Sequence, residues 1–181
     1  MSHKILCEAP IGVFDSGLGG LTVVRELRRQ LPHEQIVYFG DIARLPYGIK
    51  SEKQIREFSC ENTEFLLKRK VKAVVVACNS SSSAAYSYLK KNYSIPIIDV
   101  IQPAAEKAVS ISSRRKIGVI ATQATIASKA YDAAIRMIDK KIKWIREKNA
   151  GKSDSQIEKE FRKAKIKINL AILGGGDIIF P

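Results

Sequence analysis

The chain has 181 residues, of which 45% are hydrophobic and 27% are charged, and its formal net charge is +13. This length is enough for one domain, or one and a fraction, and the apolar content excludes a disordered chain. No apolar run reaches the ~20 residues that span a bilayer, and residues 1–10 lack the continuous apolar core of a signal peptide. We therefore expect a cytoplasmic protein without membrane contact.

The positive charge is concentrated in the second half of the chain. The net charge is +4 up to Ile111 and +9 from Ser112 onward. Most of this excess belongs to a stretch of helical appearance, Lys140 to Lys167. A run of this kind is most often a solvated helix face. Binding of nucleic acid or an anionic surface, and then of an acidic protein, are the less favoured alternatives.

The few cysteines and histidines limit which metal and catalytic sites the chain can form. The three cysteines, Cys7, Cys60 and Cys78, are widely spaced and odd in number, which fits a reducing compartment better than a disulfide framework or a zinc site. The two histidines, His3 and His33, lie away from any chemical motif. We therefore expect no metal site and no Ser/His/Asp triad.

Strands and helices alternate along the chain, and this order predicts an α/β fold with a parallel sheet built from βα units. The expected strands are Ile11–Phe14, Ile36–Phe39, a run around Val74–Val76, Ile97–Val100 and Ile117–Ala121. The expected helices are Leu21–Leu31, Ser51–Lys70 with Ser51 as N-cap, one ending near Asn92 and one after Pro103.

The pattern changes beyond Tyr131. A long basic helix is followed by a break at Gly151–Asp154, a second charged helix and a terminal apolar strand, Ile168–Leu173. We therefore divide the chain into an N-terminal α/β domain, residues 1–100, and an incomplete or diverged second α/β domain, residues 101–181, which includes the basic helical tail 140–167.

The stretch from Lys72 to Ser83 carries a β-branched run directly into a cysteine. Val74, Val75 and Val76 read as a strand buried on both faces, so Cys78 and Asn79 fall at its carboxyl end. Open α/β sheets bind ligands at that edge. The alternative is a buried thiol that acts as a small hydrophobic side chain.

A glycine-rich turn, Asp15 to Gly20, joins the first strand to the first helix. Its backbone N–H groups could converge on an anion such as a carboxylate beside the positive helix end. The turn lacks the full pattern of a nucleotide-binding loop. Asp15 itself could bind an ammonium group, tune the thiol, or only cap the turn, and the sequence leaves these roles open.

Three motifs in order resemble the glutamate racemases, of the aspartate/glutamate racemase superfamily. They are VFDSGLGGLTVVREL (13–27), YFGDIARLPYG (38–48) and VVACNSSSSAA (75–85), and later segments extend the resemblance over about residues 11–131. The resemblance implies two similar α/β domains with the substrate between them. It also implies cofactor-independent interconversion of L- and D-glutamate for peptidoglycan synthesis, and it leaves a homodimer open.

The resemblance carries roles onto seven positions. Cys78 would be one of two acid/base thiols, with Asp15 assisting; the substrate would be bound by Asp15 and Ser16 at its amino group, by Tyr47 and Gly48 at a carboxylate, and by Asn79 and Ser80. Inversion at an α-carbon needs a base on one face and an acid on the other. A thiol serves once neighbouring charge and helix ends poise it as thiolate.

The chain departs from the resemblance in its C-terminal half. The family's second thiol lies in a late GCTHYP-like motif, whereas no cysteine and no histidine follow Cys78 here. The nearest analogue is ILGGGDIIFP, where Gly175 and Asp177 replace the cysteine and the histidine. Three hypotheses follow: a glutamate racemase, a one-thiol enzyme that exchanges a proton or decarboxylates, and a non-catalytic binder of acidic amino acids or anions.

Overall fold

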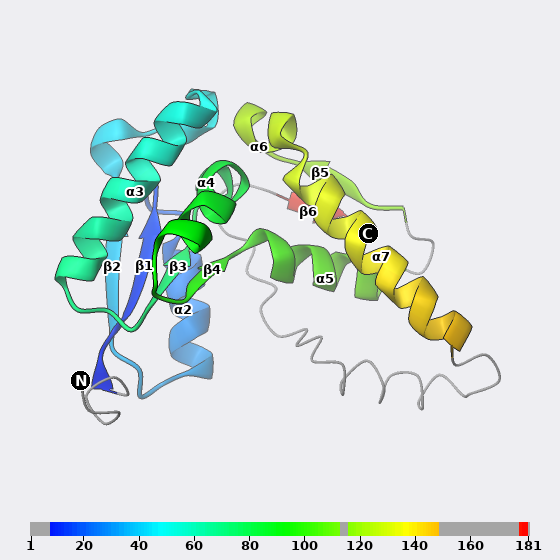
Figure 1. Ribbon diagram of the computed structural model, residues 1–181, viewed down its shortest axis with the longest axis horizontal. Helices are drawn as coiled ribbons and strands as arrows, with labels where there is room; N and C mark the ends of the chain where they lie inside the picture. The colour runs from blue at the N-terminus through cyan, green and yellow to red at the C-terminus, as the bar shows by residue number, and fades with distance from the viewer. Residues whose placement is uncertain (1–7, 113–115, 149–177, 181) are drawn as a thin grey trace.

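The computed structural model describes residues 8–112, 116–148 and 178–180, and the side chains among them up to Lys140. Helices and strands alternate through most of the chain (Figure 1). In chain order the elements are β1 (Ile11–Asp15), α2 (Leu21–Gln30), β2 (Ile36–Gly40), η1 (Ile42–Arg44), η2 (Tyr47–Ile49), α3 (Glu52–Lys68), β3 (Ala73–Val76), α4 (Asn79–Asn92), β4 (Ile97–Asp99), α5 (Ile101–Ile111), β5 (Gly118–Ile120), α6 (Gln123–Ser128), α7 (Ala130–Lys148) and β6 (Ile178–Phe180).

Four parallel strands form the main sheet in the order β2-β1-β3-β4. The chain passes from β1 outward to β2 and then returns to the other side of β1 for β3, so the connections diverge between β1 and β3. Ligands of open α/β sheets bind at such a switch point, outside the carboxyl ends of the strands. Phe14 pairs with Val76, which puts Asp15 and Cys78 at the same edge.

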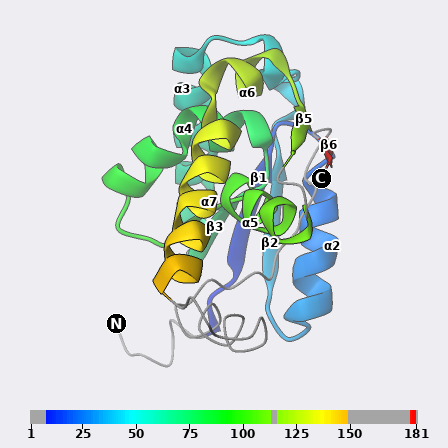
Figure 2. The same cartoon turned by 90° about the vertical axis from the view of Figure 1, so that its right-hand side faces the viewer.

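Helices cover both faces of this sheet because alternate strand residues point to opposite sides. Val13 and Val75 pack with Val23 and Leu27 of α2 on one face. On the other face, Phe14, Val74 and Val76 pack against α3 and α4, and Figure 2 shows the strands between these two layers. Val74, Val75 and Val76 are buried, so the predicted doubly buried strand is confirmed.

A third hydrophobic cluster lies beyond the sheet. It joins α5 to α7 and includes Ile101, Ala105, Tyr131 and Ile138, with Val119 of β5 at its margin. β5 pairs antiparallel with β6 in a separate two-stranded sheet. Figure 1 shows α5, α6 and α7 on the side of the main sheet where β4 lies. The domain boundary predicted at residue 100 stays a prediction.

Several sequence-based expectations are refined by the structure. Ser51 caps α3 through a capping box with Gln54, as predicted. The helix expected after Pro103 begins at Ile101 instead, because a proline in the first turn removes an N–H that has no intrahelical partner. The β5–β6 pair is antiparallel, and β6 was missed. The break at Gly151–Asp154, the second charged helix and the strand Ile168–Leu173 lie outside the described residues.

Among the described residues, no helix combines the length and the apolar character that a membrane span requires.

Candidate active site

One cavity of about 310 Å³ lies at the carboxyl edge of the main sheet, beside Cys78. Every residue for which the sequence predicts a role lines it: Asp15, Ser16, Tyr47, Gly48, Cys78, Asn79 and Ser80. These residues come from three separate segments: the end of β1 with the turn that follows it, η2, and the start of α4. The strand register brings Asp15 and Cys78 to one edge of the sheet, as expected, and the roles of the seven residues stay predictions.

Cys78 is the N-cap residue of α4 and is 4% exposed. Its Sγ accepts a hydrogen bond from the Ser81 backbone N–H at 3.5 Å and donates to Ser16 Oγ at 3.5 Å. Tyr47 and Ile55 pack beside it in a small hydrophobic cluster. Cys78 is thus a buried thiol that also borders the cavity, with polar groups around its sulfur.

Burial raises the pKa of the Cys78 thiol, and the negative charge of Asp15 raises it further. Ser16 and Ser81 act in the opposite direction by hydrogen bonding, and lower the pKa less than these two effects raise it. The sequence leads to the expectation that neighbouring charge favours the thiolate. The charge that acts on the sulfur, that of Asp15, is negative, so the neutral thiol is favoured instead.

Asp15 caps the glycine turn. Its Oδ2 accepts hydrogen bonds from the N–H groups of Gly17, at 3.1 Å, and Gly20, at 3.0 Å. The anion beside these N–H groups is therefore the Asp15 side chain. Of the roles that the sequence leaves open for Asp15, the structure thus shows capping of the turn. A Cβ on Gly20 would lie 2.6 Å from Asp15 Cβ, so the turn needs glycine there.

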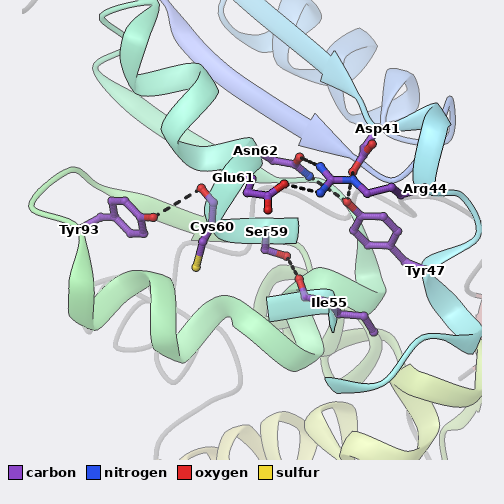
Figure 3. Close-up of polar contacts among 9 residues, drawn as sticks. All are labelled: Asp41, Arg44, Tyr47, Ile55, Ser59, Cys60, Glu61, Asn62 and Tyr93. Carbon is purple, nitrogen blue, oxygen red and sulfur yellow. Dashed lines mark hydrogen bonds and ion pairs between the residues drawn. The ribbon is translucent and has the colours of Figure 1, made fainter. Parts of the chain in front are cut away.

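A network of polar side chains binds the Tyr47 hydroxyl (Figure 3). It donates to Asp41 Oδ2 and accepts from Asn62 Nδ2 at 3.1 Å. Arg44 Nε also contacts Asp41 Oδ2, at 2.7 Å. Burial and the bond to Asp41 raise the pKa of Tyr47, so this hydroxyl stays neutral. The hydroxyl proton of Tyr47 is therefore already engaged by Asp41, and the predicted binding of a carboxylate at Tyr47 would fall to its backbone N–H.

The side chains of Asn79 and Ser80 form hydrogen bonds with residues that follow the main sheet in the chain. Tyr131 Oη donates to Asn79 Oδ1 at 2.7 Å, and Ser80 Oγ lies 3.0 Å from Thr122 Oγ1. Thr122 is the N-cap residue of α6 and contacts Thr125 Oγ1 at 3.1 Å. The substrate-binding positions predicted on α4 are therefore oriented by α6 and α7.

Thr122 also lines the cavity, and sequence reasoning missed it. It follows β5 at a strand-to-helix turn, the same signal that identified Cys78, so the rule used for Cys78 would have found it. A Cβ on Gly48 would lie 2.5 Å from Thr122 Cβ, which shows how closely the two loops approach. Leu45 and Pro46, from the loop before η2, complete this wall and were also missed.

Comparison with models of protein families agrees with the resemblance that the sequence motifs carry. The model of the Asp/Glu/Hydantoin racemase family matches residues 11–169. The chain belongs to this family.

Racemases of known sequence and structure match the chain over most of its length. The glutamate racemase of Chlorobium phaeobacteroides is 46% identical over 144 residues, which are 79% of this chain and 53% of that protein. A glutamate racemase from Bacillus anthracis superposes with a TM-score of 0.71 and 46% identity, covering 73% of this chain and 50% of that one. The glutamate racemase of Francisella tularensis, solved with D-glutamate, has a TM-score of 0.67 and 37% identity, covering 88% and 65%.

The chain spans about half the length of the curated racemases that it matches. The matched half carries the Cys78 cavity.

Proposed function

We propose that the chain carries the Cys78 half-site of a glutamate racemase, in which a cysteine moves the α-proton of glutamate without a cofactor. One observation carries this proposal: the seven residues for which the family resemblance implies roles border a single cavity of about 310 Å³. The Francisella tularensis relative, whose structure holds D-glutamate, supports glutamate as the substrate class.

The proposed chemistry begins with glutamate against the Asp15–Gly20 turn. The Asp15 carboxylate and the Ser16 hydroxyl bind the ammonium group, and the backbone N–H groups of Tyr47 and Gly48 bind a carboxylate. The Asn79 amide and the Ser80 hydroxyl bind the rest of the polar surface. An ammonium group beside Asp15 offsets the charge that opposes ionisation of Cys78, so substrate binding favours the thiolate.

The Cys78 thiolate then removes the α-proton, and negative charge builds on the adjacent carboxylate. Donors at that carboxylate stabilise the charge because they are already in place before the reaction. Inversion requires a second acid on the opposite face of the α-carbon. Among the described residues that line the cavity, Cys78 is the only thiol.

This one-sided arrangement favours a second candidate, a one-thiol enzyme that exchanges or replaces a proton from one face. Cys60 does not supply the second group, because it lies within α3, outside the cavity lining. Its thiol is half-buried, and burial raises its pKa. The chain and the complementary half of the family fold would together form the complete acid/base pair.

The biological setting proposed for the protein follows the family. D-glutamate made by such an enzyme is used in peptidoglycan synthesis, and the three scattered cysteines support a cytoplasmic location. A homodimer stays a prediction, which light scattering on the purified protein would test.

Incubation with L-glutamate in deuterated water tests the proposal. A racemase gives both deuterium at Cα and D-glutamate, a one-thiol enzyme gives deuterium without inversion, and a binder gives neither. Deuterium incorporation is followed by proton NMR and D-glutamate by chiral chromatography. Cys78→Ser should abolish both signals, whereas Cys60→Ser, which removes a thiol outside the cavity, should leave both unchanged. Persistence of either signal in Cys78→Ser would show that the site assignment is wrong.

A further inference from the structure

Ser81 occupies an unusual position beside the Cys78 sulfur. It lies in the first turn of α4 and is 0% exposed. Its backbone N–H donates to Cys78 Sγ at 3.5 Å. Its hydroxyl oxygen is one of two buried side-chain polar atoms without a hydrogen-bond partner in the described part of the chain, the other being Arg56 Nε.

The three serines next to Ser81 at the start of α4 have partners for their hydroxyl groups. Ser80 Oγ contacts Thr122, Ser82 Oγ donates to the Val76 carbonyl, and Ser83 Oγ donates to the Ser80 carbonyl. A buried hydroxyl without a partner destabilises the fold, because it has lost its hydrogen bonds to water. Ser81 therefore differs from its neighbours in a way that packing alone does not explain.

Ionisation of Cys78 would supply the missing partner. A neutral thiol is a weak acceptor, whereas a thiolate attracts every donor within reach. The Ser81 hydroxyl favours the ionised form of Cys78, and so does Ser16. Because a serine hydroxyl hydrogen rotates about the Cβ–Oγ bond, it can turn toward the sulfur when the charge appears.

We propose that Ser81 is a positioning residue for the Cys78 thiolate, whose hydroxyl has no partner while the thiol is neutral and donates to Sγ when it ionises. The S–H bond breaks, the proton leaves through the cavity and the electron pair stays on sulfur. The charge is then held by the Ser16 hydroxyl, the Ser81 N–H and the Ser81 hydroxyl. This inference rests on the proposed role of Cys78 as the acid/base thiol.

Other groups near the sulfur also affect the ionisation of Cys78. Asp15, at the end of β1, opposes the thiolate by its charge. Tyr38 of β2 interacts with both Asp15 and Cys78, and burial raises its pKa, so it stays neutral as Cys78 titrates. Tyr47 packs against Cys78 but its hydroxyl bonds to Asp41. A substitution at Ser81 leaves these groups in place.

The test is the pH dependence of Cys78 alkylation by iodoacetamide, followed by mass spectrometry. The tryptic peptide 73–90 contains Cys78 and no other cysteine, so the three thiols are read separately. Ser81→Ala should shift the midpoint of the Cys78 profile upward by about half to one pH unit, because one hydrogen bond to the thiolate is lost. Ser83→Ala, on the same helix, should leave the midpoint unchanged.

A stability measurement separates this role from a structural one. At pH 6, where the thiol is neutral, Ser81→Ala removes an unpartnered hydroxyl and should leave the urea midpoint unchanged or raise it. Alanine adds no bulk and favours the helix, so the variant should fold. An unshifted alkylation midpoint, an equal shift in Ser83→Ala, or a lowered urea midpoint for Ser81→Ala would overturn the proposal.

Alkylation requires neither glutamate nor turnover. Failure of the deuterium-exchange experiment with a shifted Ser81→Ala profile would contradict the proposed function and leave the link between Ser81 and Cys78 standing. Exchange with an unshifted profile would support the function and overturn the role of Ser81.

Discussion

Tyr131 of α7 donates a hydrogen bond of 2.7 Å to the Asn79 side chain at the start of α4, across 52 positions of the sequence. Tyr131 is 5% exposed and its ring belongs to the cluster that joins α5 to α7. The acceptor is the amide oxygen, so the bond fixes which way the Asn79 amide points. The position of α7 therefore affects the orientation of Asn79 in the candidate site.

Tyr131→Phe should weaken glutamate binding by about threefold to tenfold, because the ring stays in its cluster while the Asn79 amide loses its orientation. Isothermal titration calorimetry with L-glutamate measures this change. Tyr93→Phe is the matched control, since that hydroxyl contacts the Cys60 carbonyl and Glu64, outside the cavity lining. Equal affinities in wild type and Tyr131→Phe would contradict the proposed role of the Asn79 amide.

Gly48→Ala should destabilise the protein by about 1–3 kcal/mol, because the new Cβ would lie 2.5 Å from Thr122 Cβ and one loop must move. Urea unfolding measures the free energy of unfolding. Gly118→Ala provides the control, since no atom lies within 4 Å of its added Cβ. That variant should change stability by less than about 0.5 kcal/mol. Equal effects of the two changes would show that the two loops do not approach as closely as this.

Asp15→Asn should make Cys78 react faster with iodoacetamide at pH 7.5. The asparagine oxygen can still accept from Gly17 and Gly20, so the turn is kept, while removal of the negative charge lowers the pKa of the thiol. The same change should weaken glutamate binding, because the proposed partner of the ammonium group is lost. Asp132→Asn, on the exposed side of α7, should alter neither rate nor affinity.

The raised pKa of Cys78 also predicts how stability depends on pH. Below the ordinary cysteine pKa of about 8.5 the thiol is neutral in both folded and unfolded chains, and burial of the neutral group contributes fully. Above it the unfolded chain loses the proton first, so the free energy of unfolding falls until the folded pKa is passed.

Wild type should therefore lose stability relative to Cys78→Ser as the pH rises from about 8.5, with a slope of at most about 1.4 kcal/mol per pH unit. Urea unfolding of both proteins at matched pH values gives this difference. The comparison cancels the contributions of Cys60 and Tyr93, whose raised pKa values do not depend on Cys78. Parallel curves for the two proteins would contradict the raised pKa of Cys78.

Much of the fold could be predicted from local signals. Apolar runs such as Val74–Val76 and the capping serine at position 51 are set by nearest neighbours in the chain, and the structure has both. The pairing of β5 with β6 could not be predicted, because strand pairing joins distant segments and three-residue strands carry little signal of their own.

The candidate site divides in the same way. Asp15 and Cys78 were predicted to share an edge because the carboxyl ends of parallel strands meet there, and the Phe14–Val76 register bears this out. The part played by the Tyr47 hydroxyl was not predictable, since its partners Asp41 and Asn62 come from different elements. Nor was the unpartnered Ser81 hydroxyl, which only a complete set of neighbours reveals.

The sequence by itself determined the alternation of strands and helices, the edge at which the thiol lies and the family, because these depend on short-range patterns and on motif order. Only the tertiary structure decided that Asp15 caps its own turn, that its charge opposes ionisation of Cys78, and that Tyr131 orients Asn79. Hydrogen bonding and electrostatics depend on distances between atoms, and those distances are set only when separate segments pack together.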